Sequence, residues 1–347
     1  MQEKQLQTIQ KTDPKEAVFE LLEGLEKRSK DIIIRRFGLE GKPKETLEKI
    51  GQSYRITRER VRQIEDSVLA NLQKPNKLKY VKSLEETLIS VLQDKGDIAE
   101  RNALLSSIQD KLSLDTHSNI LEFVLELSPK FTKFAETKEL KQAWATSTSS
   151  LIKAKKIIGS FIDYLKERDK VLGTKAMINA IQEDEDVSRD AILSYINLSK
   201  NIKKNPYHEW GLKDWGTISP QGVKDKAYIV LTKKKKPLHF REITEAINQI
   251  DFDKRKATSR TVHNALIKDP RFVLVGRGTY GLTEAGYKPG TVADIVADVL
   301  AKCSLTREEI IHEVLKQRLV RKNTILLALQ DSSKFKKVGE KYYLIQK

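Results

Sequence analysis

The stretch that most constrains the fold of this chain is TLEKIGQSYRITRERVRQIEDSVLANL, at residues 46–72. Its first third has the apolar spacing of a short helix, and residues 54–56 predict a turn. The hydroxyl of Thr57 can cap a second helix. Ile56 and Val61 have the spacing of a hydrophobic staple, which fixes the angle at which that helix leaves the turn. The stretch therefore predicts a helix-turn-helix.

The second helix of this motif has two chemically different faces. Apolar residues recur at helical spacing along one of them: Val61, Ile64, Val68, Leu69 and Leu72. The other face carries Arg58, Glu59, Arg60, Arg62 and Gln63. Arginine can fork onto guanine or pair with phosphate, glutamate can accept from the cytosine amine, and glutamine can contact adenine or thymine. We expect this face to bind double-stranded DNA; the alternative is that its charges only solvate the helix.

These residues resemble region four of the housekeeping sigma factors of bacteria, the sigma-seventy family. The resemblance covers residues 15–73, and its strongest segments are IIIRRFGL at 32–39, TLEKIG at 46–51 and TRERVRQIE at 57–65. In that family the module reads the minus-35 promoter element in the major groove and rests on the flap of the polymerase beta subunit. The resemblance therefore implies two partners, promoter DNA and the RNA polymerase core.

The same resemblance implies a role for each polar residue of the second helix. By matching position, Arg58, Glu59 and Gln63 contact bases, while Arg60 and Arg62 mainly contact phosphates. Thr57, at the start of the helix, belongs to the same DNA-binding surface.

Composition and charge agree with a modular protein that has an acidic partner. The chain has 347 residues, of which 39% are hydrophobic and 32% charged, enough for more than one globular domain. A net charge of +16 makes nucleic acid the simplest partner. No apolar run approaches the roughly 20 residues of a bilayer span, and the first residues lack the apolar core of a signal peptide. We expect a cytoplasmic, nucleoid-associated protein with no membrane partner.

The sequence offers little support for catalysis or metal binding. A single cysteine, Cys303, excludes an intramolecular disulfide and a cysteine-based zinc finger. The histidines lack metal-ligand spacing: His117, His208, His239, His263 and His312. A lone Glu-x-Lys at 139–141 is the one trace of a nuclease motif, and the phosphate-binding GxxxxGK pattern is absent from the sequence. We expect no catalytic residue, metal, cofactor or small-molecule substrate.

Beyond residues 74–77, where Pro75 and Asn76 predict a linker, one order of elements recurs. A long helix, two shorter helices and two strands are followed by a closing aromatic: Trp144, Trp210, Tyr280 and Tyr343. This order describes a winged helix, and its regular return suggests a tandem array. The alternative is the ordinary spacing of helices in any helical protein.

The third copy of this pattern is the clearest. Its third helix is predicted over residues 259–268, capped by Ser259, and the strands RFVLV at 271–275 and TYGL at 279–282 flank a tight Gly-Arg-Gly hairpin. Together with PLHF at 237–240, this copy resembles the HARE-type winged helix, found in the bacterial polymerase delta subunit and in chromatin-associated and restriction proteins. In that family the domain is taken to be a nucleic-acid or adaptor module.

Further cations lie in and beside the third and fourth copies. Lys233, Lys234, Lys235 and Lys236 precede the PLHF segment, where they either contact phosphates or form a solvated loop. The hairpins add Arg277 in the third copy and Lys336, Lys337 and Lys341 in the fourth. Winged helices often contact the DNA backbone or minor groove with such hairpins.

The sequence thus predicts a mainly α protein, an N-terminal helix-turn-helix followed by tandem winged-helix domains. The predicted domains are residues 13–73, 84–146, 153–218, 223–285 and 291–347. We expect a sequence-specific DNA-binding protein of bacterial transcription, a sigma-like initiation or regulatory factor that reads minus-35-like promoter DNA. The sequence shows no segment like the aromatic-rich region two that melts DNA in full sigma factors. The alternative is an architectural or adaptor protein whose winged helices bind protein partners.

Overall fold

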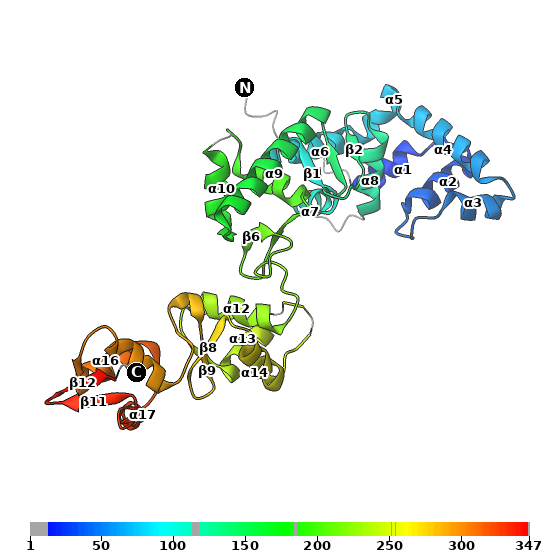
Figure 1. Cartoon of the computed structure of the whole chain (residues 1–347). Helices are drawn as coiled ribbons and strands as arrows, with labels where there is room; N and C mark the ends of the chain where they lie inside the picture. The colour runs from blue at the N-terminus through cyan, green and yellow to red at the C-terminus, as the bar shows by residue number, and fades with distance from the viewer. Residues whose placement is uncertain (1–12, 113–117, 184–185, 251, 254, 346–347) are drawn as a thin grey trace. The chain divides into compact units, whose positions relative to one another are not determined.

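The computed structural model describes residues 13–112, 118–183, 186–250, 252–253 and 255–345. The chain divides into two compact units, Met1–Lys203 with Trp210–Lys213, and Lys204–Glu209 with Asp214–Lys347. Helices dominate both units and are accompanied by small three-stranded sheets (Figure 1). The prediction of a mainly α chain is confirmed, while the five domain ranges stay a prediction.

The helix-turn-helix module consists of four helices, α1 (Pro14–Leu21), α2 (Lys27–Phe37), α3 (Leu47–Tyr54) and α4 (Arg58–Leu72). Asp13 caps α1 by accepting from the amide of Lys15 at 2.9 Å, and Pro14 occupies the first helical position, where its missing amide costs nothing. Gly38, at φ 68°, closes α2 in the left-handed conformation that glycine adopts without strain. The chain can then reverse direction toward α3.

Each winged helix has three helices and a sheet whose last strand lies in the middle. The first comprises α6 (Lys82–Asp94), β1 (Ile98–Glu100), α7 (Arg101–Leu112), α8 (Ser118–Leu127), β2 (Thr132–Phe134) and β3 (Ala143–Ala145). The second comprises α9 (Thr148–Arg168), β4 (Leu172–Gly173), α10 (Thr174–Gln182), α11 (Arg189–Leu198), β5 (Ile202–Lys204) and β6 (Glu209–Leu212).

The third and fourth winged helices repeat this order. The third comprises α12 (Val223–Lys234), β7 (Leu238–His239), α13 (Phe240–Ile250), α14 (Ser259–Lys268), β8 (Phe272–Gly276), β9 (Thr279–Leu282) and a short 3-10 turn, Thr283–Ala285. The fourth comprises α15 (Val292–Leu300), β10 (Leu305–Thr306), α16 (Arg307–Gln317), α17 (Lys322–Ala328), β11 (Phe335–Val338) and β12 (Lys341–Leu344). The sequence predicted the hairpin of each copy, but it indicated the short entry strand only in the third.

The closing aromatic of the fourth winged helix was predicted one residue too late. Tyr280 pairs with Leu238 in the third sheet, and the equivalent pair in the fourth sheet is Tyr342 with Leu305. Tyr342 packs against the core, whereas Tyr343 is 42% exposed. Side chains alternate between the two faces of a strand, so an error of one residue places the aromatic on the wrong face.

Two local predictions were also wrong. Residues 74–77 do not form an irregular linker, because Pro75 starts a short helix, α5 (Pro75–Leu78), which continues into a 3-10 turn, Lys79–Val81. Proline is tolerated at the first position of a helix. The cap of α14 is Thr258, whose hydroxyl accepts from the amide of Thr261 at 3.3 Å. The predicted cap, Ser259, is the first residue of the helix, and His117 lies outside the described residues.

The helix-turn-helix and the first winged helix share one hydrophobic core. Leu21, Phe37 and Leu72 of the former belong to the same buried cluster as Phe123 and Trp144 of the latter. The rings of Phe37 and Phe123 meet edge to face, 5.0 Å apart. Burial of this kind is the main source of folding stability. The two parts therefore form one body.

A buried carboxylate reinforces this joint. Glu122 of α8 is 3% exposed and forms ion pairs with Lys44, at 2.6 Å, and with Arg101. Burial works against ionisation of Glu122, but the hydrogen bonds from Arg101 and Lys44 outweigh it and hold its pKa below the ordinary value. Nearby, the amide of Asn119 donates to the carbonyl of Gly38 at 3.2 Å. Helix α8 is thus fixed to the helix-turn-helix by polar as well as apolar contacts.

Candidate nucleic-acid interface

The turn before α4 is built by backbone contacts. Arg55 adopts φ 52°, and the amide of Ile56 donates to the carbonyl of Gly51 at 3.0 Å. A Cβ atom added to Gly51 would lie 2.8 Å from the carbonyl oxygen of Ile56, so any other residue would force the two helices apart. Glycine is therefore required where the turn folds back on α3.

The cap and the staple predicted for α4 are both confirmed. The hydroxyl of Thr57 accepts from the amide of Arg60 at 3.1 Å. Ile56 packs against a small core made by Ile32, Ile50 and Val61. These contacts fix the direction in which α4 leaves the turn.

Two further contacts hold α3 against α2. The hydroxyl of Tyr54 donates to the carboxylate of Asp31 at 2.6 Å, and the guanidinium of Arg28 lies over the Tyr54 ring, 5.0 Å from its centre. The first helix of the motif is therefore locked to its support, and α4 with it.

The charged face of α4 is open to solvent. Its five polar residues are all exposed: Arg58, Glu59, Arg60, Arg62 and Gln63. On the opposite side Val61, Val68 and Leu72 are buried, as the helical spacing predicted. An α-helix with one free polar side fits the major groove of B-form DNA.

Two pairs of side chains lie across this face. The guanidinium of Arg62 donates to both carboxylate oxygens of Glu59 and, at 2.7 Å, to Asp66. Arg60 donates to the side-chain oxygen of Gln63 at 3.1 Å. The hydrogen bonds from Arg62 hold the pKa of Glu59 below its ordinary value, so the carboxylate stays an ionised acceptor. Exposed pairs of this type are weak, and a base or phosphate can displace them.

The structure divides the lysine run before β7. Lys233 forms an ion pair with Glu209 and lies 5.5 Å from the centre of the Tyr207 ring. Lys234, Lys235 and Lys236 are exposed. Cations at a helix C-terminus also stabilise the helix itself, so part of this run has a structural explanation.

Arg277 is exposed at the tip of the hairpin between β8 and β9, as the Gly-Arg-Gly pattern predicted. The following residue, Gly278, adopts φ 66°, and a Cβ there would lie 2.6 Å from the ring nitrogen Nε2 of His239. The hairpin therefore packs closely against the start of α13 while Arg277 projects outward.

Sequence reasoning missed two further helix faces. In α14, Val262 and Leu266 are buried, while Arg260, Thr261 and Asn264 are exposed. In the fourth winged helix the equivalent surface is formed by Arg321, Lys322, Asn323 and Thr324. The signal was present in the spacing of the buried residues, since side chains four apart define one side of a helix and leave the other side free.

The third helices of the first two winged helices offer no such face. In α8 the buried residues include the unbroken run 120–125. In α11, Ser194 donates to the carbonyl of Ile98 at 2.6 Å, and the Tyr195 hydroxyl donates to the carbonyl of Gly96 at 2.9 Å. Both helices are thus packed against other parts of the N-terminal compact unit, which leaves little of them for a DNA groove.

Comparison with known families agrees with this arrangement. Residues 21–74 match the family described as "Sigma-70, region 4", and residues 222–285 match the HARE-HTH family, described as a "restriction endonuclease HTH domain" that also occurs in ASXL proteins. The chain is a fusion of these two modules. Both are DNA-binding domains of the kind found in transcription proteins. The matches correspond to the two resemblances inferred from the sequence.

Relatives of the region 4 module are housekeeping sigma factors. RNA polymerase sigma factor SigA of Nostoc sp. (strain PCC 7120 / SAG 25.82 / UTEX 2576) is 40% identical over 68 residues, which are 20% of this chain and 17% of that protein. SigA of Microcystis aeruginosa is 42% identical over 62 residues, 18% and 15% of the two chains, and SigA of a Bacillus species is 38% identical over 72 residues, 21% and 19%. This chain therefore spans less than a fifth of the length of these relatives.

Two other kinds of site were sought in the described part of the chain. There, no helix has both the length and the apolar character that crossing a bilayer requires. Among the same residues, no group of three or more His, Cys, Asp or Glu side chains is placed to hold a metal ion. Cys303, the single cysteine, is exposed.

Proposed function

We propose that this chain is a sequence-specific DNA-binding protein of bacterial transcription that reads a minus-35-like promoter element with α4. The observation that carries the proposal is the polar face of α4, exposed along its length and held in a fixed direction by Thr57 and Ile56. Glu59 and Gln63, with Arg58, are the base-contacting residues in this proposal. Arg60 and Arg62 contact phosphates, and they release their present partners to do so.

RNA polymerase is the second partner in the proposal, by analogy with the sigma factors that share the region 4 module. The protein would act as a sigma-like regulatory factor in the cytoplasm, associated with the nucleoid. We assign it no catalytic step. The Glu-x-Lys triplet at 139–141 supports this view, because its lysine donates to the carbonyl of Asn197 and its leucine is buried between two winged helices.

An adaptor function is the second candidate, and a specific observation favours it. Helices α8 and α11 pack against other parts of the N-terminal compact unit, so these two winged helices act there as protein-binding modules. An adaptor built in this way would use the helix-turn-helix only for general DNA affinity. The two candidates differ in whether DNA is bound at selected sites.

Genome-wide crosslinking of the tagged full chain, compared with the profile of RNA polymerase, tests the proposal. We expect discrete sites at promoters that coincide with polymerase, and we expect Arg58→Ala to abolish them while Ile152→Ala, an exposed change outside the helix-turn-helix, preserves them. Uniform coverage of the chromosome, or association with polymerase that survives Arg58→Ala unchanged, would favour the adaptor.

A further inference from the structure

The outer face of a winged-helix sheet is the side turned away from that winged helix's own core. In the first winged helix, Trp144 of β3 points to the core, so its neighbours Ala143 and Ala145 lie on the outer face, together with Ile98, which pairs with Ala145. These three side chains are at most 2% exposed. Something therefore covers this face.

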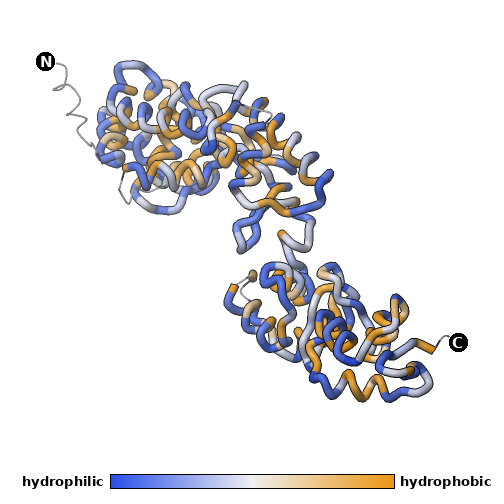
Figure 2. The backbone as a smooth tube through the Cα atoms, turned by 90° about the vertical axis from the view of Figure 1, so that its left-hand side faces the viewer, coloured by the Kyte–Doolittle hydropathy of each residue, from blue (hydrophilic) through white to orange (hydrophobic). Residues whose placement is uncertain are grey.

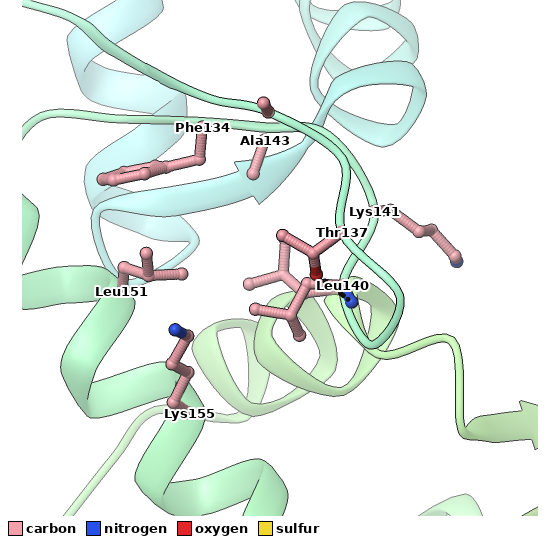
Figure 3. A pocket seen from close by; sticks show the side chains of 9 residues that line it. Phe134, Thr137, Leu140, Lys141, Ala143, Leu151 and Lys155 are labelled. Carbon is pink, nitrogen blue, oxygen red and sulfur yellow. Dashed lines mark hydrogen bonds between the residues drawn. The ribbon is translucent and has the colours of Figure 1, made fainter.

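The cover is the second winged helix. Helices α9 and α11 pack on β1 and β3, and the amide of Lys141 donates to the carbonyl of Leu198 at 2.9 Å. A pocket of about 240 Å³ remains in this joint, where Phe134 and Leu140 of the first winged helix approach Leu151 of α9 (Figure 3). The apolar lining of the pocket shows that the two winged helices meet through hydrophobic side chains.

The third winged helix repeats the arrangement with the fourth. On the outer face of β8, Val273 and Val275 are 4% and 1% exposed. The amide of Leu319, which lies between α16 and α17, donates to the carbonyl of Val275 at 2.7 Å. A Cβ atom on Gly276 would lie 2.6 Å from the carbonyl oxygen of Leu319. In this case too the next winged helix along the chain is seated on the face.

The outer face of the fourth sheet is different, because it is exposed. Phe335 and Leu344 point to the core, and the register of β11 with β12 places Lys336, Val338, Lys341 and Tyr343 on the other side, continued by Ile345. Val338, Tyr343 and Ile345 are 54%, 42% and 39% exposed. The tube in Figure 2 is correspondingly hydrophobic just before the C-terminus. Exposed apolar groups gathered in this way mark an interaction surface.

We propose that this face, defined by Lys336, Val338, Lys341, Tyr343 and Ile345, docks an acidic protein segment that carries apolar side chains. The same face is a docking face in the first and third winged helices, where its occupant is apolar. The two lysines have no counterpart among the buried outer-face residues named above, and they select an occupant of negative charge. Tyrosine is also enriched at protein interfaces, where its ring supplies contact area.

Two other occupants fit less well. A second copy of this chain would bring another net charge of +16 toward a basic face, which opposes association. DNA would satisfy the lysines but would place Val338 and Ile345 against phosphates or water. An acidic segment with apolar side chains satisfies both parts of the face.

The test uses the full chain and a labelled synthetic peptide of alternating glutamate and valine, with binding followed by fluorescence anisotropy. A polyglutamate peptide and an alternating lysine and valine peptide serve as probes for charge alone and for the opposite charge. We expect the glutamate and valine peptide to bind best. We expect Lys336→Glu with Lys341→Glu, and separately Val338→Ser with Tyr343→Ser, each to weaken it about tenfold or more, as loss of central interface contacts does.

Matched controls separate the face from general electrostatics. Lys302→Glu with Lys322→Glu makes the same charge change elsewhere on the fourth winged helix, and Leu327→Ser removes a side chain that is 65% exposed on α17. Both controls should leave peptide binding within about twofold, because truncations outside the central contacts cost little. Thermal unfolding of each variant verifies that the fold is retained.

Three results would overturn the proposal. Polyglutamate could bind as tightly as the mixed peptide, or the face variants could bind like the controls, which would leave only nonspecific charge attraction. Sedimentation could show self-association that Val338→Ser with Tyr343→Ser abolishes, which would make the occupant a second copy. Duplex DNA could bind the face in place of the peptide, with the same variants affected, which would make it a nucleic-acid surface.

Discussion

Helices α4 and α11 follow short helices in comparable motifs, but only α4 keeps a free polar face. The exposed residues of α4 include Arg58, Glu59 and Gln63, whereas α11 buries Tyr195 and Ile196 against the first winged helix. The same type of motif thus serves two purposes in one chain. In α4 the charges are left for a partner outside the chain, and in α11 the surface is used to join domains.

This contrast follows from composition at a few positions. Helix α8 has one charged residue among its first seven, Glu122, and that carboxylate is neutralised by Lys44 and Arg101. Helix α4 has five charged residues among its first eight, and its carboxylates pair only with neighbours on α4 itself or with Arg36 of α2. A helix with few charges can be buried on several sides, whereas a helix with many cannot.

The largest expected effect concerns the shared core. Phe123→Ala removes the ring that packs against Phe37, and it should destabilise the N-terminal compact unit by about 3–5 kcal/mol, as large-to-small changes in a core do. Chemical denaturation of the full chain measures the change. Arg60→Ala, on the exposed face of α4, is the control and should leave stability within about 0.5 kcal/mol.

The shared core also predicts how this unit unfolds. Far-UV circular dichroism and fluorescence of Trp144, isolated by replacing the other tryptophans with Phe, should report one transition for the helix-turn-helix and the first winged helix. If Phe123→Ala instead melts the first winged helix and leaves α1 to α4 folded, the two parts are independent, and the contrast drawn here between α4 and α8 loses its basis.

A pH effect is expected from Glu122. Its pKa is lower in the folded chain than in the unfolded chain, so its ion pairs stabilise the fold above the ordinary glutamate pKa of about 4.3 and this contribution is lost as the pH falls through the folded value. Denaturation at pH 7 and in steps below pH 4 should show the loss. Glu122→Gln should be less stable at pH 7 and should lose less on acidification; an unchanged pH profile would exclude Glu122 as a source of the effect.

The smallest effect is expected from the lysine run. Replacing Lys234, Lys235 and Lys236 with Ala should lower the slope of log affinity against log salt by about 0.9 for each phosphate that is no longer neutralised, without changing the preferred site. Lys233→Ala should change the slope less, because Lys233 is paired with Glu209. These variants belong in the full chain, since a truncation after α4 would expose the shared core. An identical slope in all of them would mean that this run does not bind DNA.

The parts of the fold that local signals control were predictable from the sequence. Thr57, Ile56 and Val61 set the start and direction of α4 by contacts within a few residues, and the Gly-Arg-Gly segment set the hairpin of the third winged helix. Such signals act through the backbone and need no knowledge of distant residues. This is why the helices and hairpins of all four copies could be placed.

Contacts between distant residues could not be predicted in the same way. Nothing near Lys233 in the sequence indicates Glu209 as its partner, and nothing in α11 indicates that Ser194 bonds to the carbonyl of Ile98. The shift from Tyr343 to Tyr342 likewise depends on pairing with Leu305, because register is set by the partner strand. The choice between a free and a covered helix face is of the same kind, and it decides which helices can bind DNA.

Binding-site selection from random duplex DNA, performed in parallel on the full chain and on Glu59→Ala, tests most directly the claim that α4 reads bases. The account predicts that the variant loses about 1–3 kcal/mol of discrimination at one base pair while general affinity is kept, because one acceptor for a cytosine amine is removed. Arg60→Ala, selected alongside, should weaken all sequences alike. Base preferences for Glu59→Ala that are identical to those of the unchanged chain would contradict the account.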